Sequence, residues 1–310
     1  MKTSYRLFGV HTLFLSLLLL CSVKASHAQS LQHKLDVQIR ADERSDKDLR
    51  YQYRIRYSPS LKFNQTWSTH GFAATGDDFS SSHNTFDDGS ADRFYLRRLF
   101  LRHQGNYGKT ELGVIPTFKG RVSSSGLSKD GWIQGIRHVR DTNSNAQLEI
   151  VVGQLNKLNP RQALDTPNDI DYVELEYSAS INDLFSYEFS MERMTSLNYL
   201  RTELRYRTKK SQHVFAELVK RANTTKVKTV LGIEGEKAYR NRDYAYFAHY
   251  SYVSGEFGLR AELTEDFLGT GHGFSAKLES QFTSLPFDWF VRFDKVGENN
   301  RILGGIKWSL

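Results

Sequence analysis

The sequence is nearly free of cysteine, since Cys21 is the only one among 310 residues. If residues 1–28 are removed on export, as argued below, the remaining chain 29–310 has no thiol. That chain can form no disulfide, no thiolate metal site and no cysteine nucleophile. Lipidation of Cys21 is a minor alternative, because Leu20 precedes it where a lipidated cysteine normally follows a small residue.

The N-terminus has the pattern of a secretory signal peptide. Lys2 and Arg6 precede an apolar run over residues 13–20, and small residues at Ser26 and Ala28 follow it. The run is shorter than the roughly 20 apolar residues that a membrane helix needs, so we predict cleavage after Ala28.

Long hydrophobic runs are also missing, because no segment after the predicted signal approaches 18 consecutive apolar residues. No transmembrane helix is therefore expected there. The charge excess is small as well: residues 1–28 hold three basic and no acidic side chains, so 39 basic face 35 acidic in 29–310. This balance gives little support to a nucleic-acid partner, and we expect none.

What the sequence does have is strict alternation. In residues 49–57, Leu and aromatic or Ile side chains occupy every odd position, and Arg or Gln occupies every even one. Period-2 alternation predicts β-strands with one apolar and one polar face. The same pattern recurs in residues 35–40, 173–179, 185–192, 201–207, 244–252, 257–263, 274–278, 287–293 and 302–310. Residues 94–101 carry apolar groups on both parities, which leaves their register undetermined.

Short turn-forming pieces separate these segments, which predicts a meander of hairpins. The predicted turns are 58–60, 105–108, 141–145, 181–183, 223–225, 254–256 and 297–300. Longer connections are predicted at 41–48, 74–92, 118–130 and 156–170, at every second connection in the first half. Long loops at one end and tight turns at the other are typical of outer-membrane barrels.

These patterns predict an all-β fold: a transmembrane antiparallel up-and-down β-barrel of about 16 strands, with 14 or 18 as neighbouring even numbers. Seventeen candidate segments can be marked, so one is spurious if the count is even. A soluble β-sandwich also alternates. It would need a second apolar face to pack against, whereas here the opposite face is charged on nearly every strand. The 36 Tyr and Phe residues suit the bilayer interface. We expect one barrel domain over residues 29–310.

The C-terminus resembles the terminal assembly signal of outer-membrane barrels. Gly305, Trp308 and Leu310 occupy its glycine, aromatic and final positions, with Leu310 where phenylalanine is usual. A last strand with free edge groups can pair with an assembly machine before it closes on the first strand.

A second resemblance covers about 30 residues. The segment 97–102, Arg-Arg-Leu-Phe-Leu-Arg, followed by Gly105 and by residues 113–118, looks like paired strands of the phosphate-selective porin O and P family. The resemblance implies a sixteen-stranded outer-membrane channel with an anion bias. No repeated lysine or arginine ladder matches that family's anion path.

The charged strand faces supply candidate pore-lining residues. They are Arg50, Arg54, Arg56, Glu174, Glu176, Glu188, Glu192, Arg201, Arg205 and Arg207. Rings of charge inside a pore set ion preference. Alternatively, opposed charges on adjacent strands neutralise each other across the wall.

Catalytic and metal motifs are sparse. The sequence has no Gly-x-Ser-x-Gly elbow and no His-Glu-x-x-His pair, and only His249, on the polar parity of its strand, merits a test as a catalytic group. The loop 74–92 carries Asp77, Asp78, Asp87, Asp88 and Asp92. It could form a constriction or bind Ca²⁺, but its spacing fits no calcium loop, and a solvated loop is the simpler interpretation. No metal and no cofactor are expected.

The function predicted from these patterns is passive diffusion of small solutes through a porin-like channel in the outer membrane of a Gram-negative bacterium, without enzymatic activity, and an anion bias of that channel is left open. The expected partners are outer-membrane lipid, the barrel assembly machinery and the solutes, and a homotrimer is one assembly open to such a barrel. Two alternatives stand beside this prediction. One is an outer-membrane barrel enzyme of lipase, deacylase or protease type, and the other is a closed structural or adhesion barrel.

Overall fold

A computed structural model describes residues 30–76, 82–86, 94–116, 132–143, 145–155, 163–164, 166–240, 242–261 and 268–310. The predicted signal peptide over residues 1–28 lies outside the described residues, and so do the five aspartates of the 74–92 loop.

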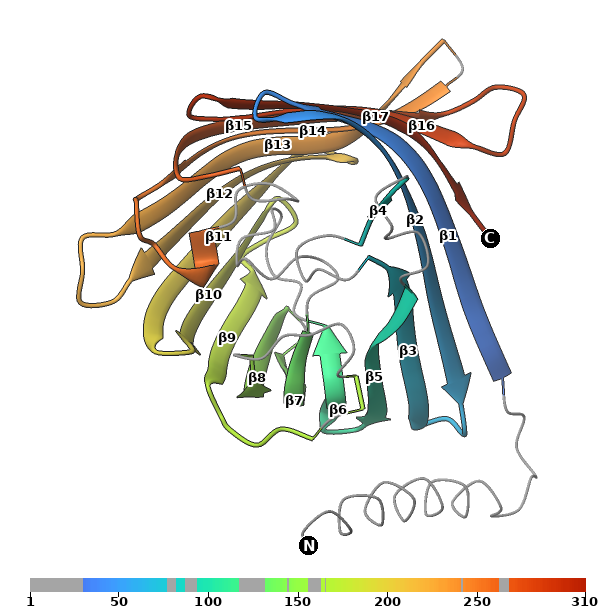
Figure 1. Cartoon of the computed structure of the whole chain (residues 1–310). Coiled ribbons are helices and arrows are strands. Elements are labelled where there is room, and N and C mark those ends of the chain that lie inside the picture. The colour runs from blue at the N-terminus through green and yellow to red at the C-terminus, as the bar shows by residue number, and fades with distance from the viewer. Residues whose placement is uncertain are drawn as a thin grey trace, which may run out of the picture.

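The described chain is all-β, with antiparallel strands joined in sequence order into one sheet (Figure 1). Its strands are β1 Ser30–Arg44, β2 Lys47–Lys62, β3 Trp67–Thr75, β4 Asn84–Thr85, β5 Phe94–Gly105, β6 Gly108–Pro116, β7 Trp132–Asn143, β8 Ala146–Gln154, β9 Tyr172–Ser180, β10 Phe185–Met194, β11 Leu197–Lys209, β12 Gln212–Arg221, β13 Val227–Tyr239, β14 Arg242–Val253, β15 Gly271–Gln281, β16 Asp288–Val296 and β17 Asn299–Ser309. The two-residue β4 pairs only with β2, beyond the point where β3 has ended. Sixteen full strands remain, which confirms the predicted number.

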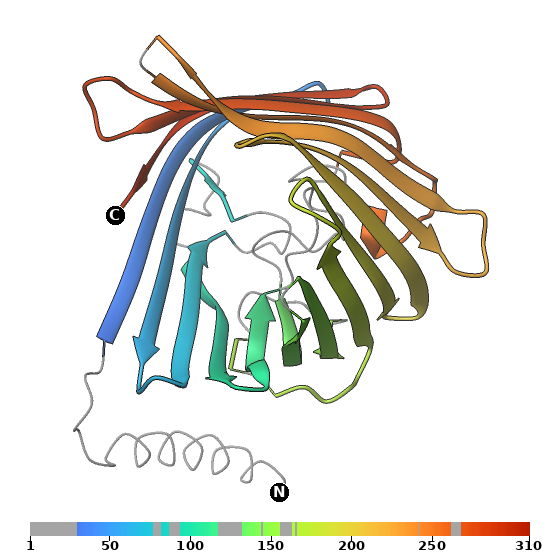
Figure 2. The same cartoon turned by 180° about the vertical axis from the view of Figure 1, so that it is seen from behind.

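The sheet closes on itself. β1 pairs with β17 in antiparallel register from Asp36↔Ser309 to Arg44↔Arg301, and the two strands lie side by side in both views (Figures 1 and 2). The terminal Leu310 exchanges two backbone hydrogen bonds of 2.9 and 3.0 Å with Leu35. The fold is therefore a closed antiparallel barrel, and residues 30–34 of β1 extend past the end of β17 and pair with β2 alone.

The two ends of the barrel differ. The tight-turn end has connections at 63–66, 106–107, 144–145, 181–184, 210–211, 240–241 and 282–287. The opposite, long-loop end has connections at 45–46, 76–93, 117–131, 155–171, 195–196, 222–226, 254–270 and 297–298. The prediction of long loops at one end only is confirmed.

Alternation decides which way each side chain points. On β11, Leu204 is 55% exposed while Arg201 on the opposite face is 1% exposed. On β2, Tyr51 is 60% exposed and Gln52 is 3% exposed. The barrel is thus apolar outside and polar inside, the reverse of a soluble β-sandwich.

The prediction of a long connection over residues 41–48 is wrong. β1 continues to Arg44 and β2 begins at Lys47, so only two residues turn. Charged residues in series are typical of a solvated loop, which is why a loop was predicted. Here Asp42 points into the barrel, and its carboxylate accepts a hydrogen bond from Arg50. In the turn itself, the Arg44 guanidinium bonded to Asp46 holds the pKa of that carboxyl below its ordinary value.

The predicted turn over residues 58–60 is also wrong, because these residues continue β2. Pro59 cannot donate a ladder hydrogen bond, and Ser58 and Pro59 form no pair with β3, although the register is the same before and after them. Gly71 on β3 makes room for the ring: a Cβ there would lie 3.1 Å from Pro59 Cγ.

The segment 257–263 was predicted as a strand, and the described part of it is not one. Residues Leu259–Ala261 form a short 3₁₀ helix, η1, inside the 254–270 connection. Glu256 and Gly258 have φ of 54° and 96°, whereas regular β-structure has a strongly negative φ. Arg260 and Ala261 are consecutive and are both buried, whereas consecutive side chains of a strand point to opposite faces.

The ambiguous register of residues 94–101 is explained by a bulge in β5. Phe72 of β3 pairs with Arg98, but the next residue, Ala73, pairs with Leu96, so Arg97 is an extra residue. A bulge inserts one residue and lets two consecutive side chains share a face. Apolar residues therefore change parity at this point, and Arg97 and Arg98 both project inward.

An apolar cluster lies inside the barrel at the long-loop end. Its members come from the inward face of ten strands and from the 155–171 and 254–270 connections: Phe100, Ile115, Ile133, Val151, Leu155, Tyr172, Met194, Tyr199, Val219, Val253, Phe257, Ala261, Leu268 and Val296. The inner wall is therefore apolar near the long loops and polar elsewhere.

Candidate functional site

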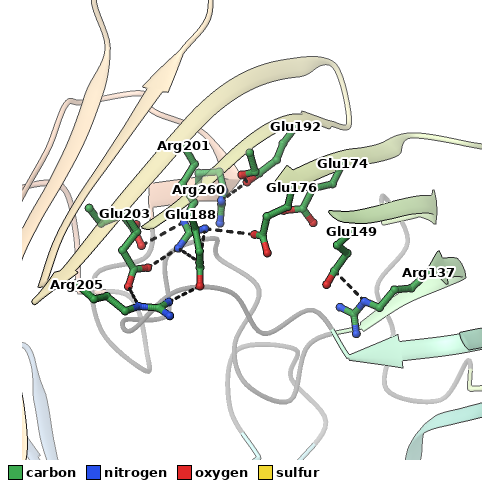
Figure 3. Close-up of polar contacts among 12 residues, drawn as sticks. Arg137, Glu149, Glu174, Glu176, Glu188, Glu192, Arg201, Glu203, Arg205 and Arg260 are labelled. Atoms are coloured by element: carbon green, nitrogen blue, oxygen red, sulfur yellow. Dashed lines mark hydrogen bonds and ion pairs between the residues drawn. The ribbon is translucent and has the colours of Figure 1, made fainter. Parts of the chain in front are cut away.

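The charged inner wall is the candidate site, and its densest part lies on β9–β12. Arg201 of β11 is fully buried and contacts four carboxylates from these four strands (Figure 3). Its guanidinium lies 3.0 Å from Glu188 and 3.4 Å from both Glu176 and Glu217, and it also bonds Glu203. A buried charge is tolerated only when it is paired and hydrogen-bonded, which this arrangement supplies.

Arg205 extends this cluster toward the tight-turn end. It lies two residues beyond Glu203 on the same face of β11, and its guanidinium is 2.5 Å from Glu188 and 2.5 Å from Glu203. Two guanidinium groups therefore face four carboxylates, and the Arg201 cluster (Glu176, Glu188, Arg201, Glu203, Arg205 and Glu217) carries an excess of negative charge when all its carboxyls are ionised.

The other predicted residues of this half have separate partners. Glu192 of β10 pairs with Arg260 of the 254–270 connection, and Glu174 of β9 accepts a 2.9 Å hydrogen bond from the Tyr172 hydroxyl. Arg207 lies at the tight-turn end of β11 and donates to the Asp183 carbonyl oxygen. Arg207 is thus apart from the Arg201 cluster.

The predicted arginines of β2 form a second group. Arg50 bonds Asp42 of β1, and Arg56 donates to the Ser82 hydroxyl at 3.3 Å. Arg54 lies between them on the same face of β2. In the barrel order, β2 is separated from β9–β12 by five or more strands on either side. The ten predicted residues therefore fall into two groups on different parts of the wall.

Sequence reasoning missed a third group on β5–β8. Glu111 of β6 accepts from Arg102 at 2.7 Å and from Arg137 at 3.1 Å. Arg137 also contacts Glu149 of β8 at 3.0 Å, as Figure 3 shows. The sequence does place Lys109 and Glu111 two residues apart, and this spacing could have predicted a charged inward face for β6.

The two bulge arginines of β5 were also missed as site residues. Arg97 donates to the carbonyl oxygens of Thr75 and Gly76 at 2.8 and 2.7 Å, and Arg98 stacks 4.2 Å over the Phe72 ring. Arg97 and Arg98 entered the sequence argument only through the family resemblance, because the bulge that turns both inward has no sequence signature.

His249, the catalytic candidate, is buried, and Ser275 and Asp294 follow it across the two neighbouring strands. It pairs across β14 and β15 with Ser275, and the Ser275 hydroxyl donates to Asp294 of β16. In a nucleophile–base–acid triad the histidine stands between the serine and the acid. Here the serine stands between them, and Asp294 is also held by Arg301 at 2.7 Å.

Two hollows open on the inner wall toward the tight-turn end. One, of about 810 Å³, is lined by β7–β11 residues that include Gln147, Ser178 and Arg205. The other, of about 460 Å³, is lined by β12–β15 residues that include His213, Phe247 and Lys277. Polar hollows of this size can hold water and small polar solutes.

Among the described residues, no helix has the length and apolar character needed to cross a bilayer. The same part of the chain holds no cluster of three or more His, Cys, Asp or Glu side chains suited to a metal ion.

The fold is similar to that of solved porins. A mutant of the Rhodopseudomonas blastica porin matches with a TM-score of 0.63 at 10% identity, over 91% of this chain and 100% of that one. OmpF of Salmonella typhi, in a complex with daunomycin, matches with a TM-score of 0.58 at 11% identity, over 90% and 97%. OmpT of Vibrio cholerae, an outer membrane protein in a trimer form, matches with 0.56 at 13%, over 91% and 100%. No protein-family model matches the sequence, and no curated protein is similar to it.

Proposed function

We propose that this chain is an outer-membrane channel for the passive diffusion of small polar solutes. The observation that carries the proposal is a closed ring of sixteen strands with an apolar outer face and a charged inner face around polar hollows. Outward apolar side chains suit lipid, and inward charges suit a water-filled passage. Passage of solutes through such a wall requires neither a cofactor nor a covalent step.

The chain's route to the membrane follows from the same proposal. Residues 1–28 would serve as a signal for export, and Gly305, Trp308 and Leu310 would present the last strand to the barrel assembly machinery before β17 closes on β1. The long-loop end would face the outside of a Gram-negative cell, since outer-membrane barrels place short turns on the periplasmic side. Association as a homotrimer belongs to this proposal, and the trimer form of the Vibrio cholerae protein of similar fold supports it.

We further propose an anion bias, carried by the wall formed by β1–β7. Its inward basic residues are Arg40, Arg50, Arg54, Arg56, Arg97, Arg98, Arg102 and Arg137, and the described inward acids of the same strands β1–β7 are fewer. The wall of β8–β13 is the acidic counterpart, with the Arg201 cluster at its centre. Charges of one sign concentrated on one wall raise the local concentration of counter-ions beside it. The resemblance of residues 97–118 to the phosphate-selective porin O and P family agrees with this bias.

Single-channel recording tests the channel directly. Purified protein refolded into a planar bilayer should produce discrete conductance steps that persist without any added substrate. A folded barrel that never conducts would contradict the proposal and would favour a closed structural barrel with a salt-bridged interior.

A further inference from the structure

The connection between β14 and β15 turns into the barrel instead of extending away from it. Phe257 and Arg260 are each 1% exposed, and Ala261 and Leu268 are buried as well. Their contacts are with inward-facing side chains of the wall, described below. The segment Phe257–Ala261, here called the inner segment, therefore lies within the cross-section of the barrel at its long-loop end.

Polar contacts from three strands hold the inner segment. Arg260 forms a buried ion pair with Glu192 of β10, visible in Figure 3. Lys228 of β13 donates to the Arg260 carbonyl oxygen at 3.3 Å, and the Tyr199 hydroxyl of β11 donates to the Phe257 carbonyl oxygen at 3.0 Å. Because β10, β11 and β13 are anchored in the sheet, these contacts fix both ends of the inner segment against the wall.

Apolar packing adds to this attachment. The rings of Phe257 and Tyr199 lie 5.5 Å apart at 47°. Phe257 and Ala261 belong to the apolar cluster at the long-loop end, which includes Val219 and Val253 of the wall. Apolar residues are not expected on the wall of a water-filled passage. Here they pack against the 254–270 connection and hold it inside the barrel.

The backbone of the inner segment is shaped for close approach. Gly258 has a φ of 96°, and a Cβ at this position would lie 2.5 Å from the Tyr199 hydroxyl oxygen and 2.7 Å from Leu197 Cδ1. Only glycine fits both this conformation and this space. The inner segment thus packs closely against Tyr199 and Leu197 on one side, while Gly258 itself stays exposed on the other.

We infer that the inner segment is a fixed constriction that sets the size limit of the solutes that pass, with Arg260 as the residue that positions it. This inference rests on the proposed channel function. Arg260 is buried and does not itself line the passage. It acts through Glu192, since two charges in a dry interior separate only at a large cost.

Reversal of one charge tests the inference. Glu192→Arg sets two cations against each other and should expel the inner segment, which raises single-channel conductance and lets larger sugars enter proteoliposomes. Adding Arg260→Glu restores an ion pair and should return both readouts toward wild type. Glu256→Lys is the matched control, because Glu256 lies in the same connection but its side chain is 90% exposed and pairs only with Lys226 at the surface.

A second variant covers the case in which Glu192→Arg does not fold. Phe257→Ser with Arg260→Ser changes only the connection and leaves every strand of the wall intact, and it should enlarge the channel in the same way. Folded variants with wild-type conductance and size limit would overturn the inference, as would an enlargement that Arg260→Glu fails to reverse. If the wild-type protein itself never conducts, the proposed channel function is wrong, and the inference of a constriction is rejected together with it.

Discussion

The ring of Phe290 on β16 lies against Gly305 on β17 and leaves no room for a side chain there. A Cβ at position 305 would lie 2.8 Å from the Phe290 ring and 2.3 Å from the carbonyl oxygen of Ile39 on β1. Position 305 is thus crowded from both neighbouring strands, at the seam where the barrel closes. The glycine of the C-terminal motif has a packing role in the folded protein, whatever its role during assembly.

Gly305→Ala should therefore destabilise the closed barrel. Overpacking at a crowded position costs about 1–3 kcal/mol of unfolding free energy. Urea unfolding in detergent micelles, followed by tryptophan fluorescence, measures this loss. Gly304→Ala is the control, because a Cβ at the adjacent position 304 meets nothing within 4 Å. Equal stabilities for the two variants would show that packing does not require glycine at 305.

Arg201→Leu tests the buried cluster on β9–β12. Removing the guanidinium leaves Glu176, Glu188, Glu203 and Glu217 without their shared partner, and breaking a buried ion pair in this way costs about 3–5 kcal/mol. The measurement is again equilibrium unfolding. Arg207→Leu should change stability far less, because Arg207 lies on the same face of β11 but its guanidinium donates to the backbone carbonyl oxygen of Asp183 and not to a buried carboxylate. A stable Arg201→Leu protein would mean that the carboxylates are relieved by water or ions.

Much of the fold could be predicted because alternation is a local property. On β2, nine residues with apolar groups at every second position suffice to define a strand and its two faces. The strand number and the unequal ends followed from counting such segments. Closure of β1 on β17 was inferred from chemistry, since free strand edges are not tolerated in lipid.

The failures share one physical cause: they depend on contacts that sequence spacing does not reveal. Phe257 and Ala261 alternate like strand residues, yet contacts with Tyr199 and the inner wall hold them in a turn. Arg97 is an inserted residue whose effect on parity appears only when β5 is aligned with β3. The partners of Arg201 come from four strands, and which glutamates converge on it depends on strand register.

Leu204→Arg asks which face contacts lipid. Leu204 lies in the middle of β11 and points outward, and a charge on the lipid face near the bilayer centre costs about 2–4 kcal/mol. The loss should appear in unfolding measured in lipid bilayers. Ser178→Arg places the same charge in the inner hollow and should leave stability nearly unchanged while it lowers conductance. The opposite ranking would mean that the faces are exchanged, and the membrane assignment would then be wrong.

Arg54→Gln combined with Arg56→Gln tests the proposed anion bias. Both side chains lie on the inner face of β2, so the double variant removes two positive charges from the basic wall. The ratio of anion to cation permeability should fall, which moves the reversal potential under a salt gradient toward the cation side. The shift should shrink in concentrated salt, because screening shortens the reach of the wall charges. Arg140→Gln removes a charge from an exposed residue of β7 and should leave the ratio unaltered. An unchanged ratio in the double variant would show that the β2 arginines are too well neutralised by their own partners to act on passing ions, and the bias would then have to come from another part of the wall.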